Sequence, residues 1–113
     1  MSPITTHVLD TTHGLPAEGM EVDLDFQDAK GVWKHMAKRK TEADGRIKDF
    51  LADDHTLARG VYRMIFETAP YLEARHIEGF YPSVTITFEV RENRHYHVPL
   101  LLSPFGYSTY RGS

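Results

Sequence analysis

The chain has 113 residues, no cysteine and a formal net charge of -3, and 41% of its residues are hydrophobic. This length suits one core, so we expect residues 1–113 to form a single domain. The lack of cysteine excludes disulfides, a thiol nucleophile and a cysteine metal site, and the charge argues against nucleic acid as a partner. No segment has the pattern of a membrane helix or a secretory signal, which predicts a cytoplasmic chain with no membrane partner.

The N-terminal part alternates polar and apolar side chains, which is the two-residue period of a β-strand with one buried face. Residues 6–10 place His7 and Leu9 on the same face of a short strand. Residues 20–26 alternate apolar with acidic side chains, which predicts a strand with a solvated acidic face. The acidic side chains are Glu21, Asp23 and Asp25.

The same period continues through the middle of the chain. Asp44-Gly45 predicts a tight turn, because glycine tolerates a positive φ. Residues 60–66 and 84–90 each alternate side chains in the manner of a half-buried strand. Residues 92–94 are polar and predict a hairpin connection to the strand that follows.

One segment breaks the strand pattern. Residues 68–76 predict a short helix, with Thr68 as its N-cap and Pro70 in its first turn. About seven or eight short strands and one short helix are typical of an all-β fold, an antiparallel β-sandwich.

The closing residues, HYHVPLLLSPFGYSTYRGS, are unusual for a chain end, because chain ends are commonly polar and poorly ordered. Over residues 95–102 one strand face is a regular core face, made of Tyr96, Val98, Leu100 and Leu102. The opposite face is also partly apolar and carries two histidines; its members are His95, His97, Pro99 and Leu101. An apolar outer face predicts that a partner subunit covers it.

The chain has seven histidines, and a strand histidine is most often a surface or hydrogen-bonded residue. His7 and His97 stand out because apolar neighbours share their faces, while the position of His95 stays open. These three imidazoles could hold a metal ion, but no carboxylate stands near them in the sequence as a partner, so we expect no metal and no cofactor. The chain also lacks a nucleophile elbow and a phosphate-binding loop.

Three blocks of the sequence resemble the 5-hydroxyisourate hydrolases, the enzyme branch of the transthyretin-like proteins. The blocks are HVLDT followed by GLPA at residues 7–17, TEADGR at residues 41–46, and the closing residues 95–113. The ending YRGS is typical of the enzyme branch, and the hormone-carrying transthyretins lack it. The resemblance runs from Thr6 to Ser113.

The resemblance implies a Greek-key β-sandwich of two four-stranded sheets with one short helix. It also implies a homotetramer, a dimer of dimers, with active sites in clefts where the dimers meet. The implied reaction belongs to purine catabolism: hydrolysis of 5-hydroxyisourate to 2-oxo-4-hydroxy-4-carboxy-5-ureidoimidazoline, on the way from urate to allantoin.

The resemblance places His7, Arg46, His97 and Ser113 in catalysis, and the same residues with Tyr110 in substrate binding. We expect His97 to be the general base, with His7 as positioner or proton partner, because imidazole titrates near neutral pH. The planar, always charged guanidinium of Arg46 suits an oxygen-rich ring and its oxyanion. The Tyr110 phenol can narrow the channel and hydrogen-bond the substrate, and Ser113 brings its terminal carboxylate within reach of the pocket.

Two other functions compete with this one. The first is a transthyretin-type carrier of a small aromatic ligand, against which the polar set of His7, Arg46, His97 and Tyr110 argues. The second is a purely structural β-sandwich in an assembly. The sequence also leaves open whether Arg111 holds the tail or contributes to the site.

Overall fold

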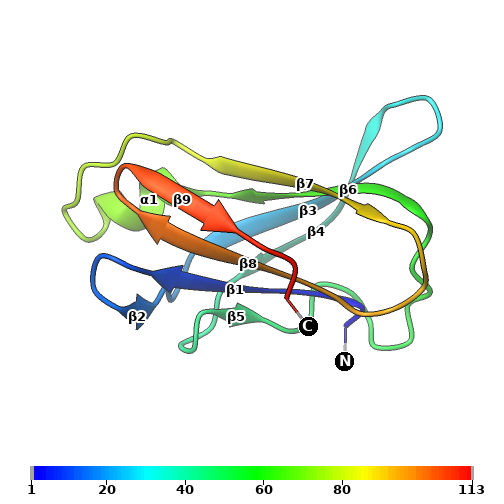
Figure 1. The fold of residues 1–113 in the computed structure, drawn as a ribbon, viewed down its shortest axis with the longest axis horizontal. Coiled ribbons are helices and arrows are strands. Elements are labelled where there is room, and N and C mark those ends of the chain that lie inside the picture. The colour runs from blue at the N-terminus through cyan, green and yellow to red at the C-terminus, as the bar shows by residue number, and fades with distance from the viewer. Residues whose placement is uncertain (1, 113) are drawn as a thin grey trace.

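The computed structural model describes residues 2–112 and places two β-sheets face to face, with one short helix at one end (Figure 1). The predicted all-β sandwich with a single short helix is confirmed. The elements are β1 (Ile4–Asp10), β2 (Leu15–Pro16), β3 (Glu21–Gln27), β4 (Trp33–Lys40), β5 (Arg46–Ile47), β6 (Gly60–Phe66), α1 (Thr68–Glu73), β7 (Val84–Val90), β8 (Tyr96–Ser103) and β9 (Gly106–Thr109).

Sheet A has the strand order β2-β1-β8-β9, with β5 paired to the same edge of β1 as β2, and sheet B has the order β4-β3-β6-β7. Sheet A thus has five strands and not four, because the two-residue strands β2 and β5 share one edge. Its central pair, β1 and β8, is parallel, whereas the other pairs are antiparallel. The parallel pair puts the first strand of the chain beside a late one.

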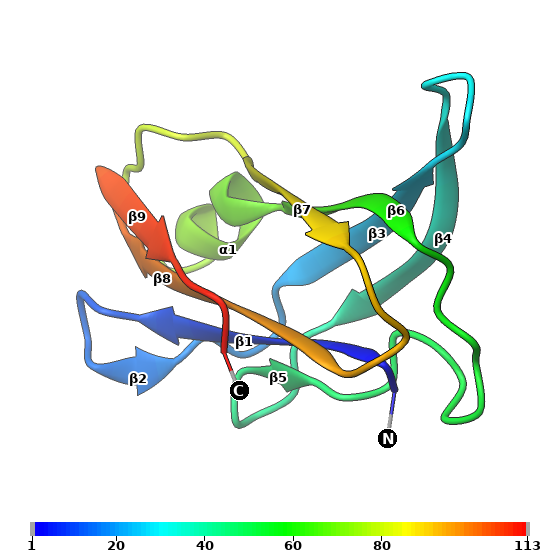
Figure 2. The ribbon, with the colours of Figure 1, turned by 45° about the vertical axis from the view of Figure 1, so that its right-hand side comes forward.

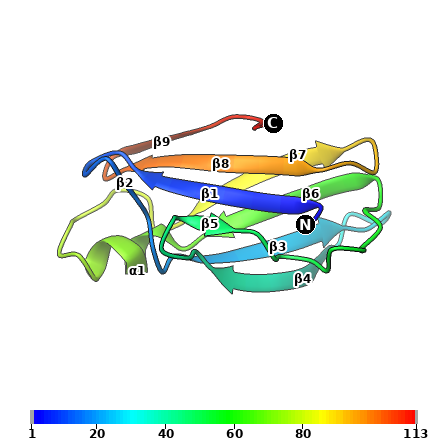
Figure 3. The same ribbon diagram turned by 90° about the horizontal axis from the view of Figure 1, so that it is seen from below.

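The connection at residues 92–94 is not the hairpin that its turn residues predicted. β7 pairs with β6 in sheet B and β8 pairs with β1 in sheet A, so the link between β7 and β8 crosses from one layer to the other. Figure 3, a view from below, shows the two layers and this crossing at one end of the sandwich. Polar turn residues mark where a strand ends, but they carry no information about which sheet the next strand joins.

The core lies between the two sheets and follows the predicted alternation. Val22 and Leu24 of β3 are fully buried, as are Met64 and Phe66 of β6. The acidic face predicted for β3 is only partly solvated, because Asp25 is 6% exposed. Its carboxylate accepts a hydrogen bond of 2.9 Å from Nε of Arg63. Burial of this carboxylate is tolerated because it is paired.

The helix α1 begins at Thr68, and Glu67 occupies the N-cap position without a side-chain capping bond. Thr68 was predicted as the cap; its hydroxyl instead donates a hydrogen bond of 2.7 Å to the carbonyl of Tyr81. The helix is therefore tied to the loop before β7 and not to its own first turn. Within residues 2–112 no helix is long and apolar enough to cross a membrane.

The end of the described chain lies over sheet A. After β9 the chain turns back across β8 toward β1 and β5 (Figure 2). The N–H of Gly112 donates a hydrogen bond of 2.9 Å to the carbonyl of His97, which forms an isolated β-bridge. The described residues after β9, 110–112, are called the tail below. This bond attaches the tail to β8, the strand that carries His97.

Candidate active site

Arg46 is placed by a tight turn that is docked on β1. Gly45 has a φ of 80°, and a Cβ added to it would lie 2.5 Å from the carbonyl oxygen of Val8, so only glycine fits this turn. The N–H of Val8 donates a hydrogen bond of 2.8 Å to the carbonyl of Gly45. The Asp44 carboxylate accepts a hydrogen bond from the N–H of Arg46 at 3.0 Å and closes the turn. The guanidinium therefore starts from a rigid backbone.

His7 lies directly opposite Arg46. The two residues are Cα partners in the antiparallel pair of β1 and β5. Directly opposed residues of such a pair project to the same face of the sheet. Their neighbours Val8 and Ile47 are buried in the core, so His7 and Arg46 point away from sheet B.

His97 reaches the same face from β8, the parallel neighbour of β1, where it is the Cα partner of Thr5. Its Nδ1 lies 2.8 Å from the Thr5 hydroxyl, and within residues 2–112 its Nε2 has no partner. A Cβ added to Gly112 would lie 2.5 Å from Cδ2 of the His97 ring. The ring is therefore held at one side by a hydrogen bond and packed at the other against the tail.

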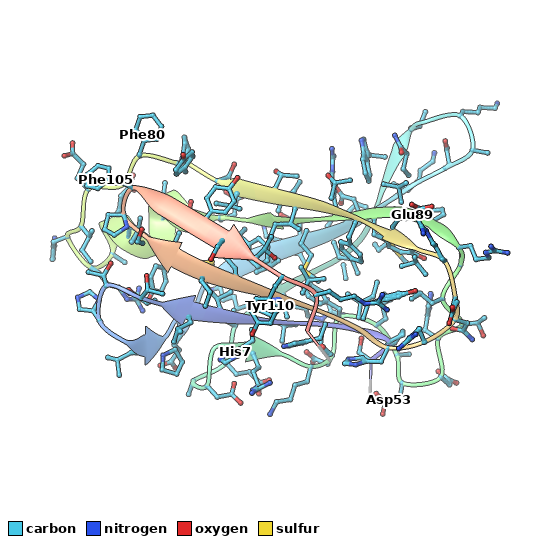
Figure 4. All side chains as sticks on the ribbon, viewed as in Figure 1. His7, Asp53, Phe80, Glu89, Phe105 and Tyr110 are labelled. Carbon is cyan, nitrogen blue, oxygen red and sulfur yellow. The ribbon has the colours of Figure 1, made fainter. Side chains whose placement is uncertain are left out.

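A cleft of about 490 Å³ collects these side chains. His7, Arg46, His97 and Tyr110 all line it, although they come from four separate segments of the chain. Figure 4, which looks onto sheet A, shows His7 on β1 and Tyr110 on the segment after β9. Among the described residues that line the cleft there is no carboxylate, whereas Arg46 and Lys48 supply positive charge.

This environment favours neutral imidazoles. Burial lowers the pKa of His97 below 6.5, and the nearby charges of Arg46, His95 and His7 lower it further. Burial and then Arg46 also lower the pKa of His7, while Asp44 partly opposes this effect. At neutral pH both rings can therefore accept a proton.

Four of the five predicted site residues are thus brought together: His7, Arg46, His97 and Tyr110. Ser113, the fifth, lies outside the described residues. Arg111 does not line the cleft, because its guanidinium stacks over the Tyr96 ring at 4.7 Å from the ring centre. The tail residue Arg111 thus packs against the body of the sandwich.

The sequence interpretation missed three polar residues that line the cleft, Thr5, Thr6 and Lys48, and it had left the position of His95 open; His95 also lines the cleft. Thr5 and Lys48 lie two positions from a predicted site residue, so the two-residue period could have found them. No group of His, Asp or Glu side chains within residues 2–112 has the arrangement of a metal site.

Residues 4–112 match the HIUase/Transthyretin family, and the chain belongs to this family. It is 44% identical to a probable 5-hydroxyisourate hydrolase of Caenorhabditis elegans, over 97% of this chain and 81% of that protein. The sequence-based assignment to this family is confirmed.

Two solved structures show the same fold from both branches of the family. Sea bream transthyretin in complex with thyroxine superposes with a TM-score of 0.91 at 30% identity, covering 98% of this chain and 95% of that chain. The 5-hydroxyisourate hydrolase of Klebsiella pneumoniae superposes with a TM-score of 0.86 at 35% identity, covering 97% of this chain and 98% of that chain. Backbone similarity therefore does not distinguish an enzyme from a carrier. The distinction has to come from the side chains that line the cleft.

Proposed function

We propose that this chain, acting as one domain over residues 1–113, hydrolyses 5-hydroxyisourate to 2-oxo-4-hydroxy-4-carboxy-5-ureidoimidazoline in urate degradation. The observation that carries the proposal is the cleft on sheet A, where two imidazoles with lowered pKa values and a guanidinium converge, with no carboxylate among the described residues that line it. Hydrolysis of a cyclic amide requires a base for water, a cation for the oxyanion and a proton for the leaving nitrogen. The cleft holds a candidate for each role.

In this mechanism Nε2 of His97 takes a proton from water as the water oxygen forms a bond to a ring carbonyl carbon. Arg46 binds the resulting oxyanion with its fixed fork of N–H donors. The intermediate then collapses, the ring C–N bond breaks and the nitrogen leaves with a proton from the histidine pair. His7, opposite Arg46, positions the substrate and shares this proton. The carboxylic acid formed in this step releases its proton to solvent, and the resulting carboxylate stays beside Arg46 until release.

Tyr110 and Ser113 complete the proposal at the tail. The Tyr110 ring lines the cleft and is 59% exposed, so its phenol is free to contact a ligand and to limit the depth of the channel. We assign Ser113 to substrate binding and catalysis, because it follows Gly112, which packs against His97. The cytoplasmic location stays a prediction.

We also propose a homotetramer, a dimer of dimers whose cleft faces its copy across the dimer–dimer interface. Two features support it. Leu101, which shares a face of β8 with His97, remains partly exposed, and the loop residue Phe105 is 69% exposed. Pro99 carries no weight here, because it is buried within the single chain. Sedimentation equilibrium gives the mass directly: about four times the 13.0 kDa chain supports the tetramer, and a monomer contradicts it.

The test of the reaction uses freshly made substrate. Urate oxidase converts urate to 5-hydroxyisourate, the protein is added, and the decay of the ultraviolet absorbance is followed. A hydrolase accelerates the decay far beyond the spontaneous rate, and the Arg46→Ala variant at the same concentration accelerates it far less. No acceleration by the wild-type protein contradicts the proposal. Calorimetric titration with thyroxine, the ligand in the sea bream transthyretin complex, then tests the carrier function.

A further inference from the structure

The hydroxyl of Thr5 connects the predicted base His97 to His95, which lies outside the predicted catalytic set. Its Oγ lies 2.8 Å from Nδ1 of His97 and 2.9 Å from Nε2 of His95. Thr5 is 5% exposed, so its hydroxyl depends on these partners for its hydrogen bonds. The two rings lie nearly parallel, with centres 6.3 Å apart and planes inclined by 21°.

The hydroxyl has one proton, so it can donate to one ring nitrogen and accept an N–H from the other. With both rings neutral, two arrangements satisfy all three groups. In the first, His97 donates from Nδ1 to Thr5, and Thr5 donates to Nε2 of His95. In the second the direction is reversed, and His97 carries its proton on Nε2. Only the first leaves a lone pair at Nε2, the nitrogen a general base needs.

The charges of the cleft select the first arrangement. Arg46 and Lys48 line the cleft, and no described carboxylate does; Asp44 pairs with both cations from outside the lining, at 3.8 and 3.3 Å, but Arg46 is the charge that acts most strongly on His97. A lone pair directed into a positive region is stabilised, whereas an N–H directed there is repelled. His95 is exposed, so its remaining N–H can be solvated by water.

We propose that Thr5 and His95 are positioning residues: the hydrogen-bonded chain His97–Thr5–His95 holds His97 as its Nδ1–H tautomer, with the Nε2 lone pair in the cleft. This inference rests on the proposed function for its catalytic consequence, but the tautomer itself is a property of the free protein. His95 acts through Thr5 and does not touch the reacting atoms.

The first experiment reads the tautomer without substrate. Two-bond ¹H–¹⁵N correlation spectra of ¹⁵N-histidine-labelled protein distinguish Nδ1–H from Nε2–H rings, and the His97→Asn spectrum assigns the signals. The wild type is expected to show His97 protonated at Nδ1. In His95→Leu the Thr5 hydroxyl loses its acceptor and donates to His97, which should convert His97 to the Nε2–H form. In His95→Gln the side-chain oxygen replaces the acceptor and keeps the wild-type tautomer.

The second experiment measures rates with the same variants. Loss of the orienting partner of a functional histidine typically costs about 10- to 100-fold in activity. We expect a loss of this size in kcat for His95→Leu and Thr5→Val, with little change in KM. Thr5→Ser and His95→Gln, which keep the hydrogen-bonding atoms, should stay close to the wild type. Because His95 is exposed, its variants remain informative even where Thr5→Val does not fold.

A wild-type His97 protonated at Nε2, or a His95→Leu spectrum with the wild-type tautomer, overturns the inference. So does an unchanged kcat in His95→Leu when the wild type is active. If the wild type does not hydrolyse 5-hydroxyisourate, the proposed function fails, while the spectra still decide the hydrogen-bonded chain on its own.

Discussion

The two sheets carry a histidine and an arginine on their outer faces in opposite electrostatic settings. On sheet B, Asp25 accepts a hydrogen bond from Arg63 at 2.9 Å, and Nδ1 of His35 lies 3.3 Å from the same carboxylate. Arg63 also covers the Trp33 ring at 4.1 Å. Asp25, Arg63 and His35 thus already have partners in this cluster, which ties β3, β4 and β6 together.

On sheet A the corresponding groups lack that compensation. Among residues 2–112, the one carboxylate paired with the guanidinium of Arg46 is that of Asp44, at 3.8 Å, and both side chains are close to half exposed. Exposed pairs of this kind contribute little to stability. The pKa values of His7 and His97 are lowered, first by burial and then by Arg46. The same residue types are thus neutralised on one sheet and available for chemistry on the other.

The largest expected effect comes from the histidines. His97→Ala should lower kcat by about 10²- to 10⁴-fold, the usual contribution of a general base, and His7→Ala should lower it less. His35→Ala on sheet B is the matched control and should leave kcat unchanged. Steady-state kinetics at saturating substrate measure all three. Equal losses for His7 and His97 would remove the assignment of His97 as base.

Next comes the arginine. Arg46→Ala should reduce kcat/KM by about 10²- to 10³-fold, because it removes the donor to the oxyanion. Arg63→Ala is its control on sheet B: it leaves the Asp25 carboxylate without its closest partner and should cost about 1–3 kcal/mol in the free energy of unfolding, with activity per folded molecule retained. Urea unfolding and kinetics separate the two outcomes. A loss of activity in Arg63→Ala with the fold intact would contradict the comparison.

A smaller loss is expected from the tail. Gly112→Ala puts a Cβ 2.5 Å from Cδ2 of His97, so the ring or the tail has to move. A displacement of about 1 Å in an active site can cost about 10²-fold in rate, and we expect a loss of about 10- to 100-fold. Gly106→Ala is the control, since its added Cβ would meet only the Ser103 hydroxyl at 3.5 Å. Full activity in Gly112→Ala would show that the tail does not support His97.

The smallest effect is the dependence on pH. Because the pKa of His97 is lowered from 6.5, the midpoint of the acid limb of kcat/KM should lie below pH 6.5. Stability should also decrease with falling pH. The unfolded chain takes up the His97 proton at a higher pH than the folded chain, so the free energy of unfolding decreases as pH falls below about 6.5. A pH–rate profile and unfolding curves test both. In Arg46→Ala the acid limb of any residual activity should shift toward higher pH.

Much of the fold follows from local patterns in the sequence. The alternation in β3, β7 and β8 predicted the strands and their buried faces, and in β6 it predicted the strand, because side chains of a strand alternate whatever its partner. Strand pairing is not local, so the hairpin predicted at residues 92–94 was wrong. The helix cap predicted at Thr68 was wrong for another reason. The Thr68 hydroxyl donates to the carbonyl of Tyr81 in the loop before β7, and nothing in the sequence around Thr68 predicts this contact.

The sequence by itself determined the family, the sandwich and the identity of the candidate groups His7, Arg46, His97 and Tyr110. Only the tertiary structure decided which residues lie beside these groups. The parallel pairing of β1 and β8 puts Thr5 beside His97, and the docked turn puts Arg46 beside His7. Residues about 90 positions apart in the chain share a hydrogen bond here, and such proximity depends on strand order, which no local period encodes.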